Sequence, residues 1–300
     1  MISIIIASVN KELLKQVSSN VATTIGVDYE IIAVDNSAGQ MGICELYNKA
    51  AEEAKYDVLC FMHEDILVKT EGWGEIVVKL FKGNPKLGLL GVAGSQYKSL
   101  APSSWHSYQD EAPELLYYNL IQSYKFTQKD SELRYSNPTN ENLVQAICLD
   151  GLWLCSTRGA FASYGFDQQL LKGFHGYDLD LSLGIGRNFE VAVTFDVLIE
   201  HFSEGNMNKS WTEEVLKVHN KWLDVLPLGV KKLTRKQEIL LEKRGFRTFI
   251  NRMKIEGFSF FTIQRFLWRS RKSEIFTKDL FIKLELHLMK IFFKKDIIKK

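Results

Sequence analysis

The chain has 300 residues, 46% of them hydrophobic and 25% charged, which is typical of a soluble globular protein with one large domain or two modest ones. No uncharged run approaches the roughly 18–20 residues that a membrane-spanning helix needs. Neither a basic segment nor a small-residue cleavage site follows Met1, so we also expect no signal peptide. The cysteines lack the pair spacing of metal sites, and we expect buried reduced thiols at Cys44, Cys60, Cys148 and Cys155.

The charge is distributed unevenly along the chain, although the formal net charge is only +2. Residues 1–229 carry 18 Lys and Arg against 29 Asp and Glu, a net charge of −11. Residues 230–300 carry 20 Lys and Arg against 7 Asp and Glu, a net charge of +13. We therefore predict an acidic domain over residues 1–228 and a basic, helical C-terminal region over residues 229–300.

Strands and helices are predicted to alternate in the first part of the chain. Apolar, β-branched runs predict strands at residues 2–7, 29–35, 56–62 and 87–94. Helix-forming stretches separate these strands, at residues 10–24, 43–55 and 72–83, and Asn10 is placed to cap the first helix. Alternation with connections of this length predicts a parallel sheet with helices on both faces.

The regular pattern stops between residues 95 and 141, which are aromatic and polar and show no clear period. An irregular insertion of this length usually carries function or is a local excursion from the domain. Regular structure resumes with strand-like sequence at 142–157, a helix start at 178–188 and a further strand at 190–201.

The C-terminal region contains a helical stripe of apolar residues with lysines on the other faces of the helix. The stripe consists of Phe276, Leu280, Leu284, Leu288 and Ile291, and the lysines are Lys278, Lys283, Lys290 and Lys294. Either the stripe packs against the rest of the protein, or the helix lies on an anionic membrane surface. Nucleic acid could also meet this charge, but the chain has no recognisable nucleic-acid motif and its body is acidic, so we expect no nucleic-acid partner.

Polar side chains end the predicted strands. They are Ser8, Asn10, Asp35, Asn36, Ser37, His63, Glu64, Asp65, Asp150 and His201, and the helix start adds Asp178 and Asp180. In open α/β sheets, ligands bind beyond the carboxyl ends of the strands, where loop amides and helix N-termini converge. We therefore expect these side chains to line one cleft. The crowding of His63, Glu64 and Asp65 would be relieved by a cation between them.

Several of these residues also have a structural interpretation. Asp35 could cap a turn, and Asp178 could cap its helix while Asp180 favours the helix dipole. His201, taken alone, could be a structural histidine. Their order along the chain is what favours a common site.

This order of motifs resembles the family 2 glycosyltransferases of the GT-A fold, and within them the branch grouped with a streptomycin-biosynthesis protein. Between residues 2 and 205, the resemblance is carried by "IIIASVN", "IIAVDNSAG", "YNKAAEEAKYDVLCFMHEDI", "GFDQQLLKGFHGYDLDLSL" and "IEHFSEGN". It implies a Rossmann-like, mixed and mostly parallel sheet flanked by helices, here followed by the basic helical extension. Members of the family are inverting enzymes that use nucleotide-sugar donors.

The resemblance also implies roles for the strand-end residues. Asp35 would contact the nucleotide base, and Asp65 would be the chief ligand of a divalent cation, Mn²⁺ or Mg²⁺. Here the first position of the family's acidic cluster is His63, which we expect to support the metal site. His201 would be an additional ligand and would favour Mn²⁺. The remaining donor-binding candidates are Ser8, Asn10, Asn36, Glu64 and Asp150, of which Glu64 would contact the ribose or sugar.

By the same resemblance, Asp178 would be the general base that deprotonates the acceptor hydroxyl. We expect the nearby Asp180 to raise its pKa above the ordinary value of about 4 and so make it a better proton acceptor. The insertion at 95–141 would form the acceptor side, because aromatic faces stack on sugars. Its aromatic candidates are Trp105, Tyr108, Tyr117, Tyr118 and Tyr124, for which local packing is the other interpretation.

The expected function is metal-dependent transfer of a sugar from a nucleoside diphosphate sugar, with UDP-type donors favoured, to a glycan or lipid-linked acceptor. The setting implied is surface polysaccharide synthesis in the cytoplasm, at the inner membrane face if residues 230–300 contact lipid. The alternative is a non-catalytic domain of GT-A fold that binds a nucleotide sugar or glycan. A nucleotidyltransferase would need a glycine-rich phosphate loop after the first strand, and a nicotinamide dehydrogenase would need G-x-G-x-x-G there; the chain has neither.

Overall fold

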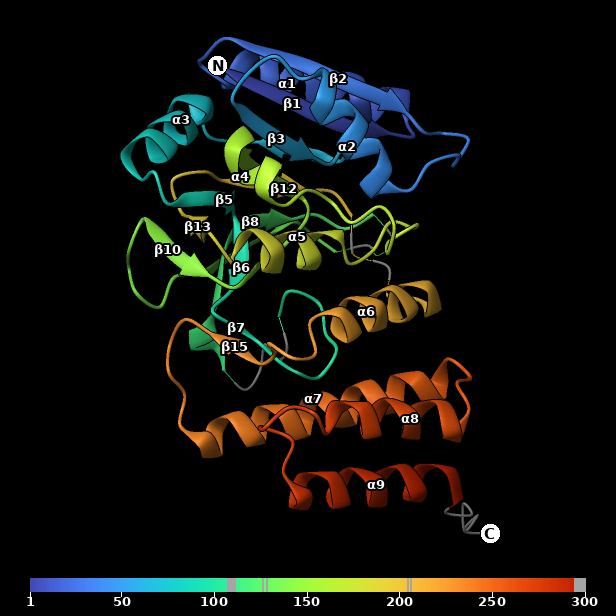
Figure 1. Ribbon diagram of the computed structural model, residues 1–300. Coiled ribbons are helices and arrows are strands. Elements are labelled where there is room, and N and C mark those ends of the chain that lie inside the picture. Colours follow the sequence, from blue (N-terminus) through green and yellow to red (C-terminus); the bar gives the residue numbers. More distant parts are fainter. Residues whose placement is uncertain (107–111, 126, 128, 204, 206, 294–300) are drawn as a thin grey trace.

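A mixed sheet forms the centre of the protein in a computed structural model that describes residues 1–106, 112–125, 127, 129–203, 205 and 207–293 (Figure 1). Its strand order is β10-β13-β5-β12-β3-β1-β2. The bounds are β1 Ile2–Ser8, β2 Tyr29–Asp35, β3 Val58–Met62, β5 Leu87–Gly91, β10 Leu143–Ala146, β12 Trp153–Thr157 and β13 Glu190–Thr194. Strand β1 is parallel to β2 and β3, and β13 is parallel to β5, whereas β12 and β10 run antiparallel to their neighbours. The predicted mixed, mostly parallel sheet is confirmed.

Helices cover both faces of this sheet because its strands alternate apolar side chains between two cores. Ile4 and Ile6 belong to the core that also contains residues of α1 (Lys11–Thr24) and α3 (Trp73–Gly83). Ile5 belongs to the other core, which contains residues of α2 (Ile43–Glu53), α4 (Arg158–Ser163) and α5 (Tyr177–Ile185). As predicted, Asn10 caps α1, where its Oδ1 accepts hydrogen bonds from the backbone of Glu12 at 2.9 Å and Leu13 at 3.3 Å.

A second sheet lies across the carboxyl end of the first. Three of the predicted strands are each divided between the two sheets. The order of the second sheet is β11-β6-β8-β14-β4, with β9 paired to β8. The bounds are β4 Ile66–Val68, β6 Ala93–Ser95, β8 Leu116–Gln122, β9 Glu132–Ser136, β11 Cys148–Leu149 and β14 Ile199–His201. The predicted strands at 87–94, 142–157 and 190–201 each pass from the first sheet into the second. Leu87–Gly91 and Ala93–Ser95 are buried throughout, so the apolar sequence at 87–94 does not reveal the point where the chain changes sheet.

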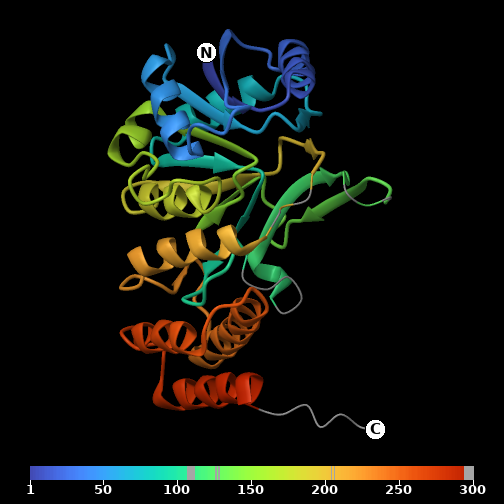
Figure 2. The ribbon, with the colours of Figure 1, turned by 90° about the vertical axis from the view of Figure 1, so that its right-hand side faces the viewer.

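The insertion at 95–141 is not irregular throughout, so that prediction was wrong for β8 and β9. The two strands pair antiparallel and extend to one side of the body (Figure 2). Most of β9 is exposed, and an edge strand without a buried face shows no alternation of apolar and polar residues. A short 3₁₀ helix, Pro113–Leu115, precedes β8. Tyr108, one of the aromatic candidates, lies outside the described residues.

Helices dominate the chain after residue 208. They are α6 Lys209–Lys221, α7 Arg235–Ile255, α8 Phe260–Ser270 and α9 Lys278–Phe293. The predicted boundary at residue 228 falls within β15 (Leu228–Gly229), which pairs with β7 (Tyr97–Lys98). In α9, Leu280, Leu284 and Leu288 are at most 1% exposed, so the apolar stripe is the packed face of this helix. Lys294 lies outside the described residues.

Two further properties concern the helices and the cysteines. Within the described part of the chain, no helix combines the length and hydropathy that crossing a bilayer requires. All four cysteines are buried and free, as expected.

Glu242 anchors the C-terminal helices to the first part of the insertion, at β7 and the residues that follow it. The side chain lies on α7 and is fully buried. Its carboxylate accepts hydrogen bonds from the Tyr97 hydroxyl at 2.7 Å and from the backbone of Leu100 at 3.0 Å and Ala101 at 2.9 Å. Burial raises the pKa of Glu242 to about 7, although these three donors oppose the rise.

Replacing Glu242 with Ala is expected to lower the free energy of unfolding by about 3 kcal/mol or more, because three buried donors lose their acceptor. Urea unfolding would measure the change. Glu238→Ala is the matched control, since Glu238 on the same helix is partly exposed and forms a 3.6 Å ion pair with Arg235. Equal losses in the two variants would show that Glu242 does not anchor this part of the insertion.

Candidate active site

The ends of β2, β1 and β3 bring polar side chains to one rim of the central sheet. Ser8, the last residue of β1, lies beside Asp35, the last residue of β2. The Ser8 hydroxyl donates a 2.7 Å hydrogen bond to Glu64, just beyond β3. Asp35, Ser8 and Glu64 therefore follow one another along this rim.

Several of the predicted donor-binding residues hold the turns of this rim in place. The Glu64 carboxylate, 9% exposed, also accepts hydrogen bonds from the backbone of Val9 and Asn10 at 3.1–3.2 Å. The Asn36 amide both donates to and accepts from the backbone of Met41. Asp35 is exposed, and its Oδ1 accepts from the Ser37 backbone at 2.9 Å, which is the turn-capping contact that the sequence left open.

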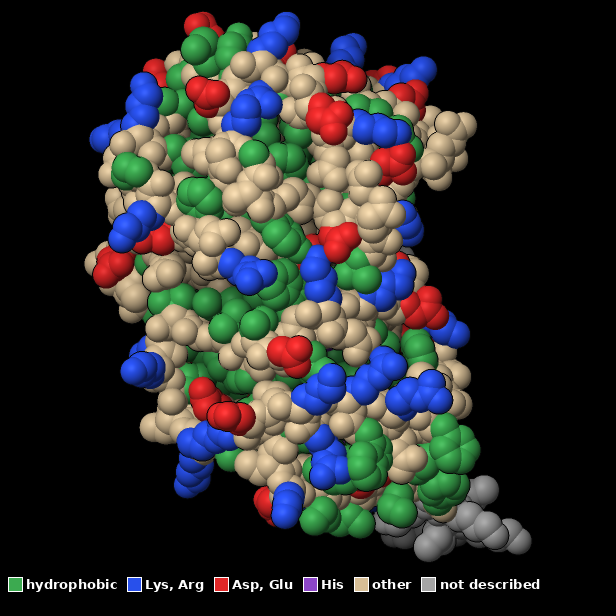
Figure 3. Space-filling view, in the orientation of Figure 1, with side chains coloured by type: hydrophobic (Ala, Val, Ile, Leu, Met, Phe, Trp, Pro, Cys, Tyr) green, Lys and Arg blue, Asp and Glu red, His purple; other side chains and the backbone are tan. Residues whose placement is uncertain are grey.

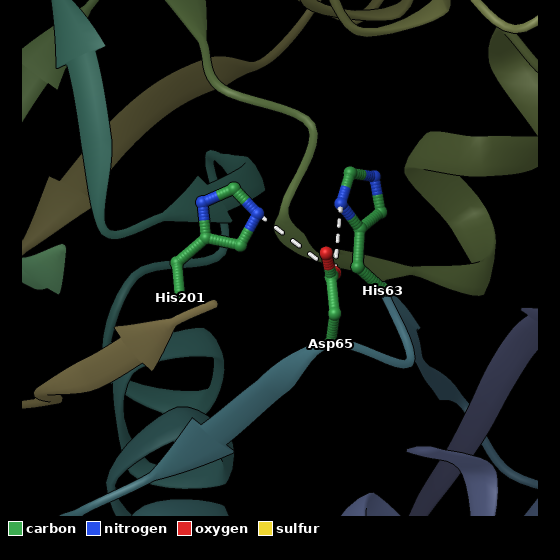
Figure 4. A group of neighbouring side chains, drawn as sticks. All are labelled: His63, Asp65 and His201. Carbon is green, nitrogen blue, oxygen red and sulfur yellow. Dashed lines mark ion pairs between the residues drawn. The ribbon is translucent and has the colours of Figure 1, made fainter. Parts of the chain in front are cut away.

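A compact group of three side chains, called the metal group below, comes next along the rim and consists of His63, Asp65 and His201 (Figure 4). His63 follows β3, Asp65 precedes β4, and His201 ends β14, whose antiparallel pairing with β4 places His201 opposite Ile66. Asp65 Oδ1 lies 3.8 Å from His63 Nδ1 and 3.8 Å from His201 Nε2. One ligand atom from each residue lies within 4.8 Å of the others, so the group could hold a divalent cation.

The surroundings of this group suit a metal ligand set. The Ser203 hydroxyl donates a 2.6 Å hydrogen bond to Asp65 Oδ2 and so orients the carboxylate. Burial opposes the ionisation of Asp65, but His63, His201 and Ser203 together lower its pKa. Burial lowers the pKa of His63, which favours the neutral imidazole that a metal requires. Two imidazole nitrogens with one carboxylate oxygen suit Mn²⁺ better than Mg²⁺.

The structure places His63 within the group itself, beside Asp65, where the sequence predicts a supporting residue. Its Nε2 lies 2.7 Å from the Tyr177 hydroxyl, which is also 3.1 Å from the Gly151 carbonyl oxygen. The single hydroxyl hydrogen satisfies both contacts if it is donated to Gly151 while His63 Nε2–H donates to the Tyr177 oxygen. That tautomer leaves a lone pair on Nδ1, the nitrogen that faces Asp65.

Removal of the Tyr177 hydroxyl in Tyr177→Phe is expected to weaken Mn²⁺ binding by about 10–100-fold, because His63 loses the partner that fixes its ring. Calorimetric titration with Mn²⁺ would measure the affinity. Tyr164→Phe is the control, because it removes a partly buried hydroxyl that donates to Asp180 at 2.8 Å and does not contact His63, Asp65 or His201. Equal affinities in Tyr177→Phe and the wild type would contradict the assignment.

A cavity of about 610 Å³ opens beside the metal group. Residues lining it include His63, His201, Asp150 and Asp178, together with Trp105 and Tyr118 from the insertion. Among the other aromatic candidates, Tyr117 is buried in the core, and the hydroxyl of Tyr124 bonds with Glu132 on β9. Asp35 and Asp65 are not among the residues that line this cavity within the described part of the chain, so it joins only some of the side chains that were expected to line one cleft.

Asp178 is the second residue of α5 and not its cap, which is Gly176 with a φ of 76°. Burial raises the pKa of Asp178 to about 7, and the nearby charge of Asp150 adds to the rise. The expectation that Asp180 raises this pKa was wrong. Asp180 is 1% exposed, forms a 2.9 Å ion pair with Lys221 and accepts a 2.8 Å hydrogen bond from Trp222. Residues two apart on a helix point in different directions, so Asp180 faces away from the cavity.

Two other polar residues near the cavity gave no signal in the sequence. His106 lines the cavity, and its Nδ1 is buried without a partner among the described residues. Burial lowers its pKa to about 4, so the ring is neutral near pH 7. Lys98 is fully buried and donates to Ser103 and Ser104, which supports the segment that carries Trp105 and His106. Both residues lie in a part of the chain without a recognisable period.

Comparisons with known proteins agree with this architecture. The family model described as "Glycosyltransferase like family" matches residues 3–221. No curated protein sequence matches the chain. A mannosyltransferase from Pyrobaculum calidifontis, solved with GDP-Man and Mn²⁺, is 10% identical with a TM-score of 0.48, over 98% of this chain and 88% of that one.

The structure of GalNAc-T7 with UDP, GalNAc and Mn²⁺ is 9% identical with a TM-score of 0.53. The match covers 97% of this chain and 56% of that one, and at this identity it shows a common fold. The predicted GT-A-type fold is thereby confirmed. Since the family model covers residues 3–221, most of the 300, the chain belongs to the glycosyltransferase-like family.

Proposed function

We propose that the protein is an inverting, metal-dependent glycosyltransferase that moves a sugar from a nucleoside diphosphate sugar to a glycan or lipid-linked acceptor. The observation that carries the proposal is a carboxylate with a pKa raised to about 7, Asp178, in the same cavity as the imidazoles of His63 and His201. A proton acceptor in a cavity beside a group that could hold a metal ion provides the parts that sugar transfer from a diphosphate needs.

In the proposed reaction, an acceptor hydroxyl gives its proton to the Asp178 carboxylate. The hydroxyl oxygen bonds to the anomeric carbon, and the bond from that carbon to the diphosphate oxygen breaks, so that its electron pair leaves with the nucleoside diphosphate. Attack from the face opposite the leaving group inverts the anomeric configuration. A divalent cation bound by His63, Asp65 and His201 would neutralise charge on the diphosphate.

The donor end of the site is proposed to lie along the rim that holds Asp35 and Glu64. We assign the base contact to Asp35, whose exposed side chain has a second carboxylate oxygen beyond the one that caps the turn. Ser8, Asn10, Asn36 and Glu64 would then shape the donor pocket through the turns that they hold. A UDP-type donor is favoured in this proposal.

We propose a cytoplasmic setting in surface polysaccharide synthesis, with residues 1–228 as the catalytic domain and residues 229–300 as an extension near the inner membrane face. Placement in the branch grouped with a streptomycin-biosynthesis protein belongs to the same proposal, and rests on the motifs between residues 2 and 205.

The test is a screen of UDP-, GDP- and dTDP-sugars with Mn²⁺, first by thermal shift and then by release of nucleoside diphosphate, with and without EDTA. Transfer that depends on Mn²⁺ and stops with EDTA supports the proposal. Tight binding of UDP without turnover on any acceptor would instead favour a non-catalytic domain that binds a nucleotide sugar. The presence of His63 where the family has an acidic residue is the observation that favours this second candidate.

A further inference from the structure

We propose that the outer face of α8 and α9 is a docking surface for the anionic headgroup layer of a membrane. The packed stripe of α9 leaves a second apolar stripe on the opposite side of the same helix. Ile282, Leu286, Met289 and Phe293 are 56%, 60%, 47% and 68% exposed. At 3.6 residues per turn these four side chains lie within a narrow sector of the helix surface. An exposed apolar stripe of this kind marks an interaction site.

Lysines border this outer stripe on both sides. At helical spacing, Lys278 lies on one side of it, and Lys283 and Lys290 lie on the other. All three are exposed. An exposed apolar stripe with lysines on either side, of which Lys283 also pairs with Asp279 at 2.6 Å, matches a helix lying in a membrane interface, where the apolar side chains enter the acyl boundary and the ammonium groups reach phosphate headgroups.

Helix α8 extends the surface with aromatic and basic side chains. Phe261 is 74% exposed and Trp268 is 54% exposed, and they lie near each other at helical spacing. Arg265 and Arg269 are exposed beside them. Aromatic contacts join the two helices: the Phe260 and Phe293 ring centroids are 5.2 Å apart, as are those of Trp268 and Phe281. Figure 3 shows hydrophobic side chains gathered at this end of the molecule and bordered by Lys and Arg side chains.

The charge favours a lipid surface over a second copy of the chain. Residues 230–300 carry 20 Lys and Arg against 7 Asp and Glu, so two copies meeting through this face would oppose like charges. The cores of protein interfaces are depleted of charged residues, whereas Lys278, Lys283 and Lys290 border the stripe here. An anionic bilayer satisfies the apolar and the basic side chains together.

This inference deepens the proposed membrane-proximal location, and it is tested without donor or acceptor. The purified full chain is mixed with vesicles of phosphatidylcholine alone or with part of the lipid replaced by phosphatidylglycerol, and bound protein is measured by flotation. We expect binding to the anionic vesicles that weakens with salt. The triple variant Ile282→Gln, Leu286→Gln, Phe293→Gln should bind about tenfold or more weakly. Val225→Gln, at a residue outside these helices that is 47% exposed, should bind like the wild type.

A second variant, Lys283→Gln with Lys290→Gln, should lose the preference for anionic vesicles. Thermal unfolding and Mn²⁺-dependent donor turnover should be unchanged in both sets, so a failure of docking is distinguishable from a failure of the proposed catalysis. The inference is overturned if the triple variant binds anionic vesicles as well as the wild type does. It is equally overturned if the wild type ignores vesicles and forms a dimer that the triple variant does not form.

Discussion

Asp178→Asn is expected to lower the turnover number of sugar transfer by roughly 10²–10⁴-fold, the usual contribution of a positioned general base. The substitution keeps the size of the side chain but removes the carboxylate that faces the cavity beside Asp150. Because the acceptor hydroxyl loses its proton acceptor while the donor site is untouched, the Michaelis constant for the donor should change little. Initial rates at saturating Mn²⁺ would measure both quantities.

The pH dependence of the transfer rate tests this prediction independently. A general base must be ionised, and burial with the charge of Asp150 raises the pKa of Asp178 to about 7. The wild-type rate should therefore rise as the pH rises through about 7 and level off above it. In Asp150→Asn one source of the raised pKa is gone, so the midpoint should move to lower pH.

Asp180→Asn is the matched control, because Asp180 lies two residues away on the same helix but pairs with Lys221 and Trp222. That variant should lose stability while the midpoint of its pH profile stays at the wild-type value. If Asp178→Asn kept both the wild-type rate and the wild-type profile, Asp178 would not be the base.

The sequence predicts most of the central sheet because burial on both faces produces uninterrupted apolar runs. β1 and β2 were predicted to within one residue, and the cap at Asn10 marks the start of α1. The second sheet could not be predicted, because β6 continues the apolar run of β5, and β8 and β9 lie in the insertion without a recognisable period. No residue between β5 and β6 signals that the chain leaves one sheet for the other, since Val92 is as buried as its neighbours.

The positions of the candidate site residues could be predicted where they depend on the ends of strands. They could not be predicted where they depend on the face of a helix or on contacts between distant parts of the chain. Asp65 and His201 meet because β4 pairs with β14. The partnership of His63 with Tyr177 joins residues 114 apart in the chain, and no local pattern announces it. The sequence places Asp180 only two residues from Asp178, which suggests an effect on the pKa of Asp178. On a helix, however, residues two apart point in different directions.

Asp65→Asn is expected to reduce Mn²⁺-dependent transfer about a hundredfold or more, since several kcal/mol of transition-state stabilisation come from a bound cation. The variant keeps the shape of the side chain and its neighbour Ser203, but it removes the anionic oxygen that lies 3.8 Å from each imidazole. The rate should be measured as a function of Mn²⁺ concentration, with EDTA-treated protein as the baseline. A wild-type Mn²⁺ response in Asp65→Asn would show that the cation, if needed, binds elsewhere.

A double-mutant cycle with His201→Ala sharpens this test. If Asp65 and His201 hold the same ion, either substitution alone removes most of the metal contribution, and the double variant should be little worse than the poorer single variant. If the two side chains acted independently, the two losses in free energy would add. Strictly additive losses, with each single variant still responding to Mn²⁺, would show that these side chains do not bind a common ion. Their 3.8 Å contacts would then have a structural role.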